Sequence, residues 1–239
     1  MLFDSSYYND KYFKIPGGKE FRRSDGRIDH WSYANPDGEW SGCDPIVKAW
    51  KEIFQCGTML DAGCGRGTFV GYARAAGIEA SGFDFSDWAI SNPYRRCKKE
   101  WLRLHDATEV WPYPDRAFDL VTVLDLMEHI YMDDINSVIN QIYRVSKKWV
   151  FLQIATVKEG SHDRSYILKK GEPVPIELDV YAVAGHVTVQ TEQFWVNRFV
   201  RPGWRMRKDI VNKFINLVPH DVIRNWILNT MIVMERIET

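Results

Sequence analysis

The stretch Met59-Leu60-Asp61-Ala62-Gly63-Cys64-Gly65-Arg66-Gly67-Thr68-Phe69-Val70 decides the fold of this chain. It predicts a short buried strand that ends in an acid, then a turn with three alternating glycines, and then the start of a helix. Glycine allows the backbone to turn sharply and to approach a ligand closely, and the start of a helix offers unpaired N–H groups. The stretch therefore predicts a ligand cradle between a strand and a helix.

A second acid follows this turn at a spacing that indicates a nucleotide. Residues 79–83 predict a second strand, which ends in Asp84. In nucleotide-binding α/β folds, an acid about 20 residues further on, at the tip of the neighbouring strand, hydrogen-bonds ribose hydroxyls. The alternating glycines differ from the dinucleotide fingerprint G-x-G-x-x-G. The alternative is that Asp84 is only a solvated acid at a strand end.

The glycine-rich turn resembles motif I of class I S-adenosylmethionine (SAM)-dependent methyltransferases. Five further segments resemble the family in the same order, and with the turn they span residues 58–155: Gly82-Phe83-Asp84-Phe85-Ser86, Leu104-His105-Asp106-Ala107-Thr108, Trp111-Pro112-Tyr113-Pro114-Asp115, Phe118-Asp119-Leu120-Val121 and Leu126-Met127-Glu128-His129-Ile130. The resemblance implies SAM as cofactor and methyl transfer as activity.

Strands and helices alternate along the middle of the chain. Strands are predicted at residues 101–104, 120–124 and 149–155, and helices at residues 69–76, 87–99 and 135–143. The helix over residues 87–99 is expected to be interrupted near its start by Asn92-Pro93. Asp133 and Asp134 are predicted to cap the last of these helices. Residues 204–210 and 230–237 predict an antiparallel pair, which resembles the extra hairpin of the family. We therefore predict an α/β fold: a doubly wound, mostly parallel seven-stranded sheet (Rossmann-like) with a C-terminal antiparallel hairpin and an N-terminal cap.

The chain is long enough for one large α/β domain, and we predict a single methyltransferase domain over residues 1–239. Residues 1–45 are rich in Tyr, Gly and Asp and are predicted to form a cap or lid. Residues 46–155 form the SAM-binding half. Residues 156–239 hold a substrate loop and the hairpin, because residues 156–186 have no clean period and several Gly and Pro.

The resemblance implies which residues hold SAM. They lie on the glycine-rich turn and at the tips of the following strands: Asp61, Gly63, Gly65, Gly67, Asp84, Phe85, Asp106, Ala107 and Leu124. Asp61, Gly63 and Gly65 are expected to line the methionine moiety and the ribose. Asp84 is expected to hold the ribose hydroxyls, and Asp106 with Ala107 to face the adenine. The alternative for Gly67 is close helix packing only.

The segment Asp125-x-x-Glu128-His129 has two interpretations. In many family members that use no metal, the Glu-His pair orders the loop. Small-RNA 3′-terminal 2′-O-methyltransferases carry Glu-x-x-Glu-His here and bind a divalent ion with a further histidine, and ubiquinone-biosynthesis O-methyltransferases are similar. With His186, this segment can imitate that set, since carboxylates and imidazole suit Mg²⁺ or Mn²⁺. Asp in place of Glu shortens one ligand, and we predict that no metal binds.

His186 is the first candidate for a catalytic base. It lies in Gly185-His186-Val187-Thr188, where similar small-molecule methyltransferases often place a histidine near the acceptor. An unperturbed imidazole titrates close to pH ~6.5, so it can accept a proton from a hydroxyl. A satisfied structural histidine is the alternative. His129 is the second candidate for the base.

Composition and missing motifs narrow the acceptor. The net charge is −1, which gives no global field for nucleic acid. No Asn/Asp-Pro-Pro-Tyr/Phe follows the central strand, which argues against base or amide N-methylation. The local basic cluster is either a solvated edge or a phosphate site: Arg198, Arg201, Arg205, Arg207, Lys208 and Lys213. We predict a cytoplasmic protein, because the four cysteines lack metal spacing and the chain shows no secretory signal and no membrane-length apolar run. A monomer or homodimer is expected.

We therefore predict a SAM-dependent methyltransferase whose acceptor is a small molecule, with a hydroxyl of a sugar, polyketide or quinone-like compound as the reacting group. Nucleic acid and membrane partners are not expected. The enzyme alternative is an RNA 2′-O-methyltransferase, which the near-neutral charge disfavours. The alternative from another class is a non-catalytic SAM-binding subunit, and the intact glycines and acids argue only that the cofactor site is kept.

Overall fold

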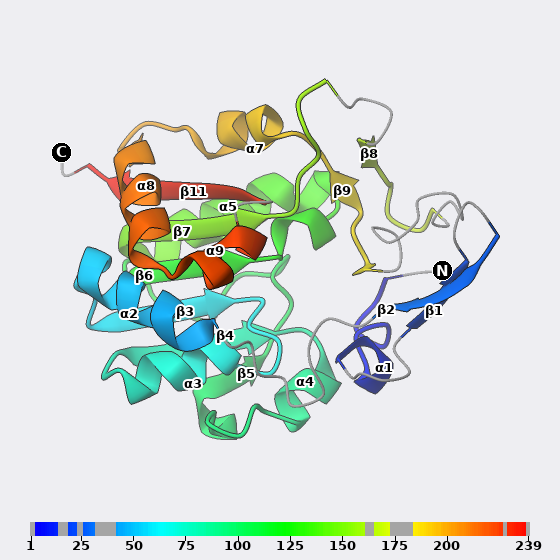
Figure 1. Ribbon diagram of the computed structural model, residues 1–239, viewed down its shortest axis with the longest axis horizontal. Coiled ribbons are helices and arrows are strands. Elements are labelled where there is room, and N and C mark those ends of the chain that lie inside the picture. Colours follow the sequence, from blue (N-terminus) through cyan, green and yellow to red (C-terminus); the bar gives the residue numbers. More distant parts are fainter. Residues whose placement is uncertain are drawn as a thin grey trace.

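The structure is a computed structural model that describes residues 3–13, 19–22, 26–31, 42–160, 165–172, 184–226 and 229–237. Within this part, seven strands form one sheet in the order β10-β11-β7-β6-β3-β4-β5 (Figure 1). The strands are β3 (Thr58–Ala62), β4 (Glu79–Asp84), β5 (Leu102–Leu104), β6 (Phe118–Leu124), β7 (Ser146–Ile154), β10 (Trp204–Met206) and β11 (Thr230–Arg236). β3 to β7 run parallel, whereas β11 is antiparallel to β7 and to β10. The predicted fold class is confirmed.

β6 is the middle strand of the sheet, as its unbroken apolar run predicts. Leu120 to Leu124 are all buried, because helices cover both faces of the parallel strands. The one polar residue in this run is Thr122. Its buried hydroxyl donates a hydrogen bond of 2.8 Å to Oδ1 of Asp61 on β3, so the core strand carries no unpaired hydroxyl at this point.

Helices pack on both faces of the sheet. Six of them are α2 (Cys43–Phe54), α3 (Thr68–Ala75), α5 (Met132–Val145), α7 (Glu192–Phe199), α8 (Lys208–Leu217) and α9 (His220–Trp226). One apolar cluster joins α2, α3, α8 and α9 to Met59, and a second joins α5 and α7 to Leu60. Adjacent residues of a strand point to opposite faces, so Met59 and Leu60 belong to different clusters. The result is a sheet between two helical layers (Figure 1).

α5 forms where the apolar period predicts it. Ile135, Val138, Ile139, Ile142 and Tyr143 are buried against the sheet, which is one face of a helix with 3.6 residues per turn. The helix begins earlier than predicted, with Tyr131 in the N-cap position. The two acids expected as caps therefore lie inside the first turn, where their charge is favourable to the positive end of the helix dipole.

Three predicted elements differ from the structure. The helix expected over residues 87–99 breaks at Asn92-Pro93 as predicted, but it does not resume, so only α4 (Asp87–Ser91) forms. The strand expected over residues 204–210 ends at Met206, and α8 begins two residues later. β10 and β11 are antiparallel as predicted, but α8 and α9 connect them instead of a tight turn. Sequence analysis did not predict α2.

Smaller elements lie outside the main sheet. α1 (Asp10–Phe13) is followed by the antiparallel pair β1 (Lys19–Arg22) and β2 (Ile28–Trp31), and β8 (Tyr166–Ile167) pairs with β9 (Thr188–Val189). Two short 3-10 turns are present: η1 (Lys99–Trp101) precedes β5, and η2 (Met127–His129) follows β6. Parts of the expected cap and substrate loop lie outside the described residues, so these boundaries remain predictions. Among the described residues, no helix has the length and apolar character needed to cross a membrane.

Candidate active site

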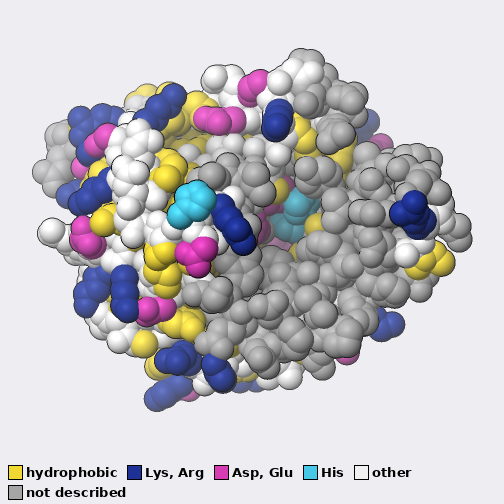
Figure 2. Space-filling view, viewed as in Figure 1, with side chains coloured by type: hydrophobic (Ala, Val, Ile, Leu, Met, Phe, Trp, Pro, Cys, Tyr) yellow, Lys and Arg dark blue, Asp and Glu magenta, His cyan; other side chains and the backbone are white. Residues whose placement is uncertain are grey.

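A cavity of about 630 Å³ lies at the carboxyl ends of β3, β4, β5 and β6. Its wall comes from the segments after these strands and from residues 3–13, and Lys170 also borders it. In the view of Figure 2 the surface is hollowed right of the centre, where histidine and acidic side chains are visible. The volume is typical of a small-molecule site, and the carboxyl ends of parallel strands are where open α/β sheets bind ligands.

The glycine-rich turn forms one end of the cavity. Gly63 and Gly65 both have positive φ, at 74° and 52°, which L side chains rarely adopt. The N–H groups of Gly63 and Cys64 donate to the Phe83 carbonyl, each at 2.9 Å, and this ties the turn to β4. A Cβ at Gly63 would lie 3.0 Å from Leu126, so the backbone itself borders the cavity at this point.

Asp84 is held rigidly at the tip of β4. Its Oδ2 accepts the N–H of Gly65 and its Oδ1 accepts the N–H of Ser86, both at 2.8 Å. Burial raises the pKa of this carboxyl above its usual value, and the two N–H donors oppose that shift. Asp84 and Phe85 both border the cavity, so the structure brings these two predicted residues to the glycine-rich turn.

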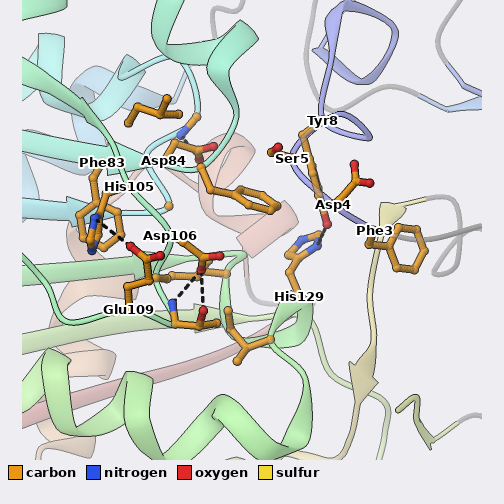
Figure 3. Close-up of a pocket in the computed structure, with 18 of the residues that line it drawn as sticks. Phe3, Asp4, Ser5, Tyr8, Phe83, Asp84, His105, Asp106, Glu109 and His129 are labelled. Atoms are coloured by element: carbon orange, nitrogen blue, oxygen red, sulfur yellow. Dashed lines mark hydrogen bonds and ion pairs between the residues drawn. The ribbon is translucent and has the colours of Figure 1, made fainter. Parts of the chain in front are cut away.

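Asp106 and Ala107 border the same cavity after β5. Oδ1 of Asp106 accepts hydrogen bonds from the backbone N–H and the hydroxyl of Thr108, both at 2.8 Å, which fixes the carboxylate in a turn. Figure 3 shows Asp84 and Asp106 on one side of the cavity and Tyr8 and His129 on the other. These two acids therefore border one cavity, and their roles at the ribose and the adenine remain predictions.

Three predicted cofactor residues do not border the cavity: Asp61, Gly67 and Leu124. Asp61 is buried beside Thr122, and burial raises the pKa of its carboxyl to about 7. A Cβ at Gly67 would lie 2.7 Å from both Cys97 Sγ and Leu102 Cδ2, so this glycine permits close packing of α3. Leu124 is buried in the core of the sheet.

His129 borders the cavity opposite the acids. Its Nδ1 lies 3.1 Å from the Gly185 carbonyl oxygen and 3.1 Å from the Tyr8 hydroxyl. A carbonyl oxygen only accepts, so the contact with Gly185 places the ring proton on Nδ1 and leaves Nε2 as the basic nitrogen. Burial lowers the pKa of His129 to about 4, so the ring is neutral at neutral pH.

His186 lies behind His129 and is not among the residues that border the cavity. The two rings pack edge to face with their centroids 4.8 Å apart. Burial, and then the neighbouring His129, lower the pKa of His186 well below its usual value. The structure thus brings both predicted bases together, and His129 is the one that a ligand in the cavity would meet.

Within the part of the chain that the structure describes, Glu128, His129 and His186 could hold a metal ion, because they offer one ligand atom each within 4.8 Å of one another. Oε1 of Glu128 accepts the N–H of Ala155 at 2.9 Å. The carboxyl groups of Glu128 and Asp125 also interact, and burial raises the pKa of both above their usual values. Asp125 borders the cavity with a positive φ of 47°, which is a strained conformation for this residue.

Sequence analysis named no single residue of the N-terminal segment, yet residues 3–13 form part of the cavity wall. Phe3, Tyr8, Tyr12 and Phe13 all border the cavity, and Tyr8 and Tyr12 pack together with ring centroids 4.7 Å apart. The density of aromatic residues in Ser6-Tyr7-Tyr8-Asn9-Asp10-Lys11-Tyr12-Phe13 was the available signal. That signal does not reveal which distant residues these rings contact.

Most of the predicted basic cluster has partners within the fold. Glu235 pairs with Arg205 at 2.7 Å and with Arg207 at 2.5 Å, and Arg207 also pairs with Asp209 at 2.6 Å. Arg201 donates to Asn140 and lies over the Tyr143 ring. None of these residues borders the cavity. The cluster thus fits a solvated edge of the sheet better than a phosphate site.

Comparison with known proteins is consistent with this site. A methyltransferase-domain family matches residues 38–208, whereas no curated protein sequence matches the chain. The YcgJ protein from Bacillus subtilis is similar in structure, with a TM-score of 0.55 and 13% identity over 81% of this chain and 98% of that one. The plantazolicin methyltransferase BpumL, solved in complex with SAH, has a TM-score of 0.56 and 12% identity over 82% of this chain and 83% of that one. The PH0226 protein from Pyrococcus horikoshii OT3 has a TM-score of 0.51 and 14% identity over 80% of this chain and 89% of that one. At these identities the solved structures show a shared fold.

Proposed function

We propose that the methyl acceptor of this protein is the hydroxyl group of a small molecule such as a sugar, a polyketide or a quinone-like ring. The chain belongs to the methyltransferase family that matches residues 38–208. The protein is a SAM-dependent methyltransferase, and SAM is its cofactor. The observation that carries the proposed acceptor is an imidazole, His129, which borders a cavity of small-molecule size and has its Nδ1 held by the Gly185 carbonyl.

The residues that border the cavity offer hydrogen-bond acceptors for SAM. Gly63 and Gly65 have positive φ and border the cavity, so the backbone of the turn faces whatever fills this end. Asp84, fixed by two N–H groups, is our candidate for the ribose hydroxyls, and Asp106 for the adenine amino group. SAM supplies a methyl group that is already activated on a sulfonium. The residues of the chain therefore have to orient the acceptor and exclude water.

His129 is our candidate for the general base. The Gly185 carbonyl fixes the proton on Nδ1, and no hydrogen bond within the described residues involves Nε2. A neutral imidazole with an available nitrogen can take the proton of a hydroxyl as the methyl group is transferred. His186, the first candidate from the sequence, packs against the far side of this ring and supports it.

The charge of the cavity favours a neutral or cationic acceptor over RNA. Among the described residues that border it, Lys170 is the one Lys or Arg. Seven are acidic: Asp4, Asp84, Asp87, Asp106, Glu109, Asp125 and Asp134. Phosphate groups would meet like charge here, which disfavours binding. Lys and Arg side chains on the face shown in Figure 2 are interspersed with acidic ones instead of forming a stripe.

The proposal is tested with deuteromethyl-labelled SAM. The purified protein is incubated with a cell extract divided into a small-molecule fraction and an RNA fraction, and labelled products are identified by mass spectrometry. We expect a labelled methyl ether in the small-molecule fraction. Label in RNA, or on nitrogen or carbon of the product, would contradict the proposed acceptor. SAM binding without any labelled product in either fraction would favour a non-catalytic SAM-binding subunit.

A further inference from the structure

Tyr8 contacts the imidazole at the cavity from a position 121 residues away in the chain. Its hydroxyl lies 3.1 Å from His129 Nδ1 and 3.5 Å from the Gly185 carbonyl oxygen. Its ring packs edge-on against His129 and tilted against Phe85, with centroids 5.8 Å and 5.0 Å away. Figure 3 shows the phenol and the imidazole directly against each other. Tyr8 is therefore placed to act on His129.

The hydrogen-bonding capacity of these three groups decides where each proton lies. The Gly185 carbonyl can only accept, so it takes the proton of His129 Nδ1. The Tyr8 hydroxyl both donates and accepts, so it can accept from the same Nδ1–H and donate to the same carbonyl. This closed set of contacts is satisfied when the proton is on Nδ1. With the proton on Nε2, Nδ1 would present a lone pair to the carbonyl oxygen, which is repulsive.

Gly185 leaves the space that the hydroxyl occupies. Its φ is +88°, and a Cβ there would lie 2.6 Å from the Tyr8 hydroxyl oxygen, so any side chain would displace the phenol. Tyr8 is also buried, so little solvent reaches its hydroxyl to replace these partners. The phenol, the carbonyl and the imidazole are thus fitted to one another.

The N-terminal segment does not depend on the Tyr8 hydroxyl for its position. Tyr12 donates a hydrogen bond of 3.1 Å to the Ala184 carbonyl. Phe13 stacks on Trp88 with ring centroids 5.6 Å apart. Loss of one hydroxyl at residue 8 therefore leaves the segment anchored at two other points, so its effect on His129 can be measured separately.

We propose that Tyr8 is a positioning residue for methyl transfer: its hydroxyl, together with the Gly185 carbonyl, holds His129 with the proton on Nδ1 and the lone pair on Nε2. The value of this arrangement for catalysis rests on the proposed function, in which Nε2 takes the proton of the acceptor hydroxyl. The position of the ring proton does not rest on it. Tyr8 touches His129 and so acts on the reaction through that residue.

Imidazole ¹⁵N chemical shifts test the proposal without any acceptor. Protein labelled with ¹⁵N-histidine is studied in complex with S-adenosylhomocysteine, and the His129 signals are assigned by their loss in His129→Gln. In the wild type we expect a protonated, pyrrole-type Nδ1 and an unprotonated, pyridine-type Nε2. In Tyr8→Phe the Nδ1 shift should move but stay pyrrole-type, because the Nδ1 proton loses the Tyr8 oxygen and keeps only the Gly185 carbonyl as its acceptor. With the acceptor found by the labelled-SAM experiment, kcat should fall about tenfold while KM for SAM changes little, as expected for one lost neutral hydrogen bond.

Two further variants control for a merely structural effect. Tyr7→Phe removes a hydroxyl from the neighbouring buried residue, which does not border the cavity, and should leave the His129 shifts unchanged. Gly185→Ala leaves Tyr8 intact but forces its hydroxyl away, and should reproduce the moved Nδ1 shift. Unchanged His129 shifts in Tyr8→Phe, a moved Nδ1 shift in Tyr7→Phe, or an unprotonated Nδ1 in the wild type would overturn the proposal. A moved Nδ1 shift in Tyr8→Phe together with methyl transfer to nitrogen or carbon would instead support the positioning role and contradict the proposed acceptor.

Discussion

At the scale of single residues, His129 is the group on which the proposed chemistry depends. Burial lowers its pKa to about 4, so the ring is neutral at neutral pH and turnover should not show an imidazole ionisation near pH ~6.5. His129→Gln is predicted to lower turnover by ~10²–10⁴-fold and to leave SAM affinity nearly intact, because this is the usual size of general-base help. His186→Gln changes the ring that packs against His129 and should lower turnover by a smaller factor. Steady-state kinetics of the two variants decides the order, and a larger loss in His186→Gln would make His186 the base.

Asp61 gives a prediction about stability and pH. Burial raises its pKa from 3.8 to about 7, so between these values the unfolded chain loses a proton that the folded chain keeps. The stability that this residue contributes is therefore full at low pH and is lost as the pH rises toward 7, by at most about 1.4 kcal/mol per pH unit. Asp61→Asn keeps the acceptor for Thr122 and has no such proton. Its thermal midpoint without cofactor should rise relative to wild type as the pH increases over this range, and parallel midpoints at all pH values would refute this account.

The Glu128, His129 and His186 group gives a prediction about metals. Glu128 already holds the Ala155 N–H and interacts with Asp125, whereas His129 Nδ1 is held by Gly185 and Tyr8. These contacts order the loop after β6 without an ion, so turnover is predicted to survive excess EDTA. An assay after chelation and gel filtration tests this. Complete loss of turnover that Mg²⁺ or Mn²⁺ restores would show instead that these three residues are ligands.

At the scale of elements, the fit of α3 against its neighbours depends on Gly67. Gly67→Ala would bring a methyl group to 2.7 Å from Cys97 Sγ and Leu102 Cδ2, at a φ of 74°. Overpacking and a strained backbone are each expected to cost about 1–3 kcal/mol, which should lower the thermal midpoint by several degrees. SAM affinity, measured well below that midpoint, should stay close to wild type. A large loss of affinity with an unchanged midpoint would show that Gly67 serves the cofactor directly.

Elements with a clean apolar period were predictable, and those at a change of pattern were not. α5 and β6 lie where their patterns place them, since one buries a single helical face and the other both faces of a strand. Residues 204–207 alternate like a strand, and this alternation hides the start of α8 at Lys208. The two acids before Ile135 indicate a helix start but not which residue takes the cap position. Boundaries depend on a few local hydrogen bonds, which the period does not encode.

At the scale of the whole molecule, the cavity joins segments that are far apart in the chain. The glycine-rich turn, Asp84 and Asp106 come together because the carboxyl ends of parallel strands meet at one edge of the sheet, which the sequence does predict. The meeting of Tyr8, His129 and Gly185 was not predictable, because no local pattern links residues in a loop, a 3-10 turn and the N-terminal segment. The cofactor side of the site therefore follows from topology, and the acceptor side from packing.

The central claim is that this cavity binds SAM through Asp84, and titration calorimetry tests it most directly. SAM, S-adenosylhomocysteine and NAD are titrated into the wild type, into Asp84→Ala and into Asp44→Ala, which changes an exposed acid on α2 away from the cavity. We predict that the wild type binds SAM and S-adenosylhomocysteine but not NAD, and that Asp44→Ala behaves in the same way. Asp84→Ala should weaken both by roughly ten- to hundredfold, through the loss of charge-assisted hydrogen bonds of about 1.5–3 kcal/mol. Unchanged affinity in Asp84→Ala would contradict the claim.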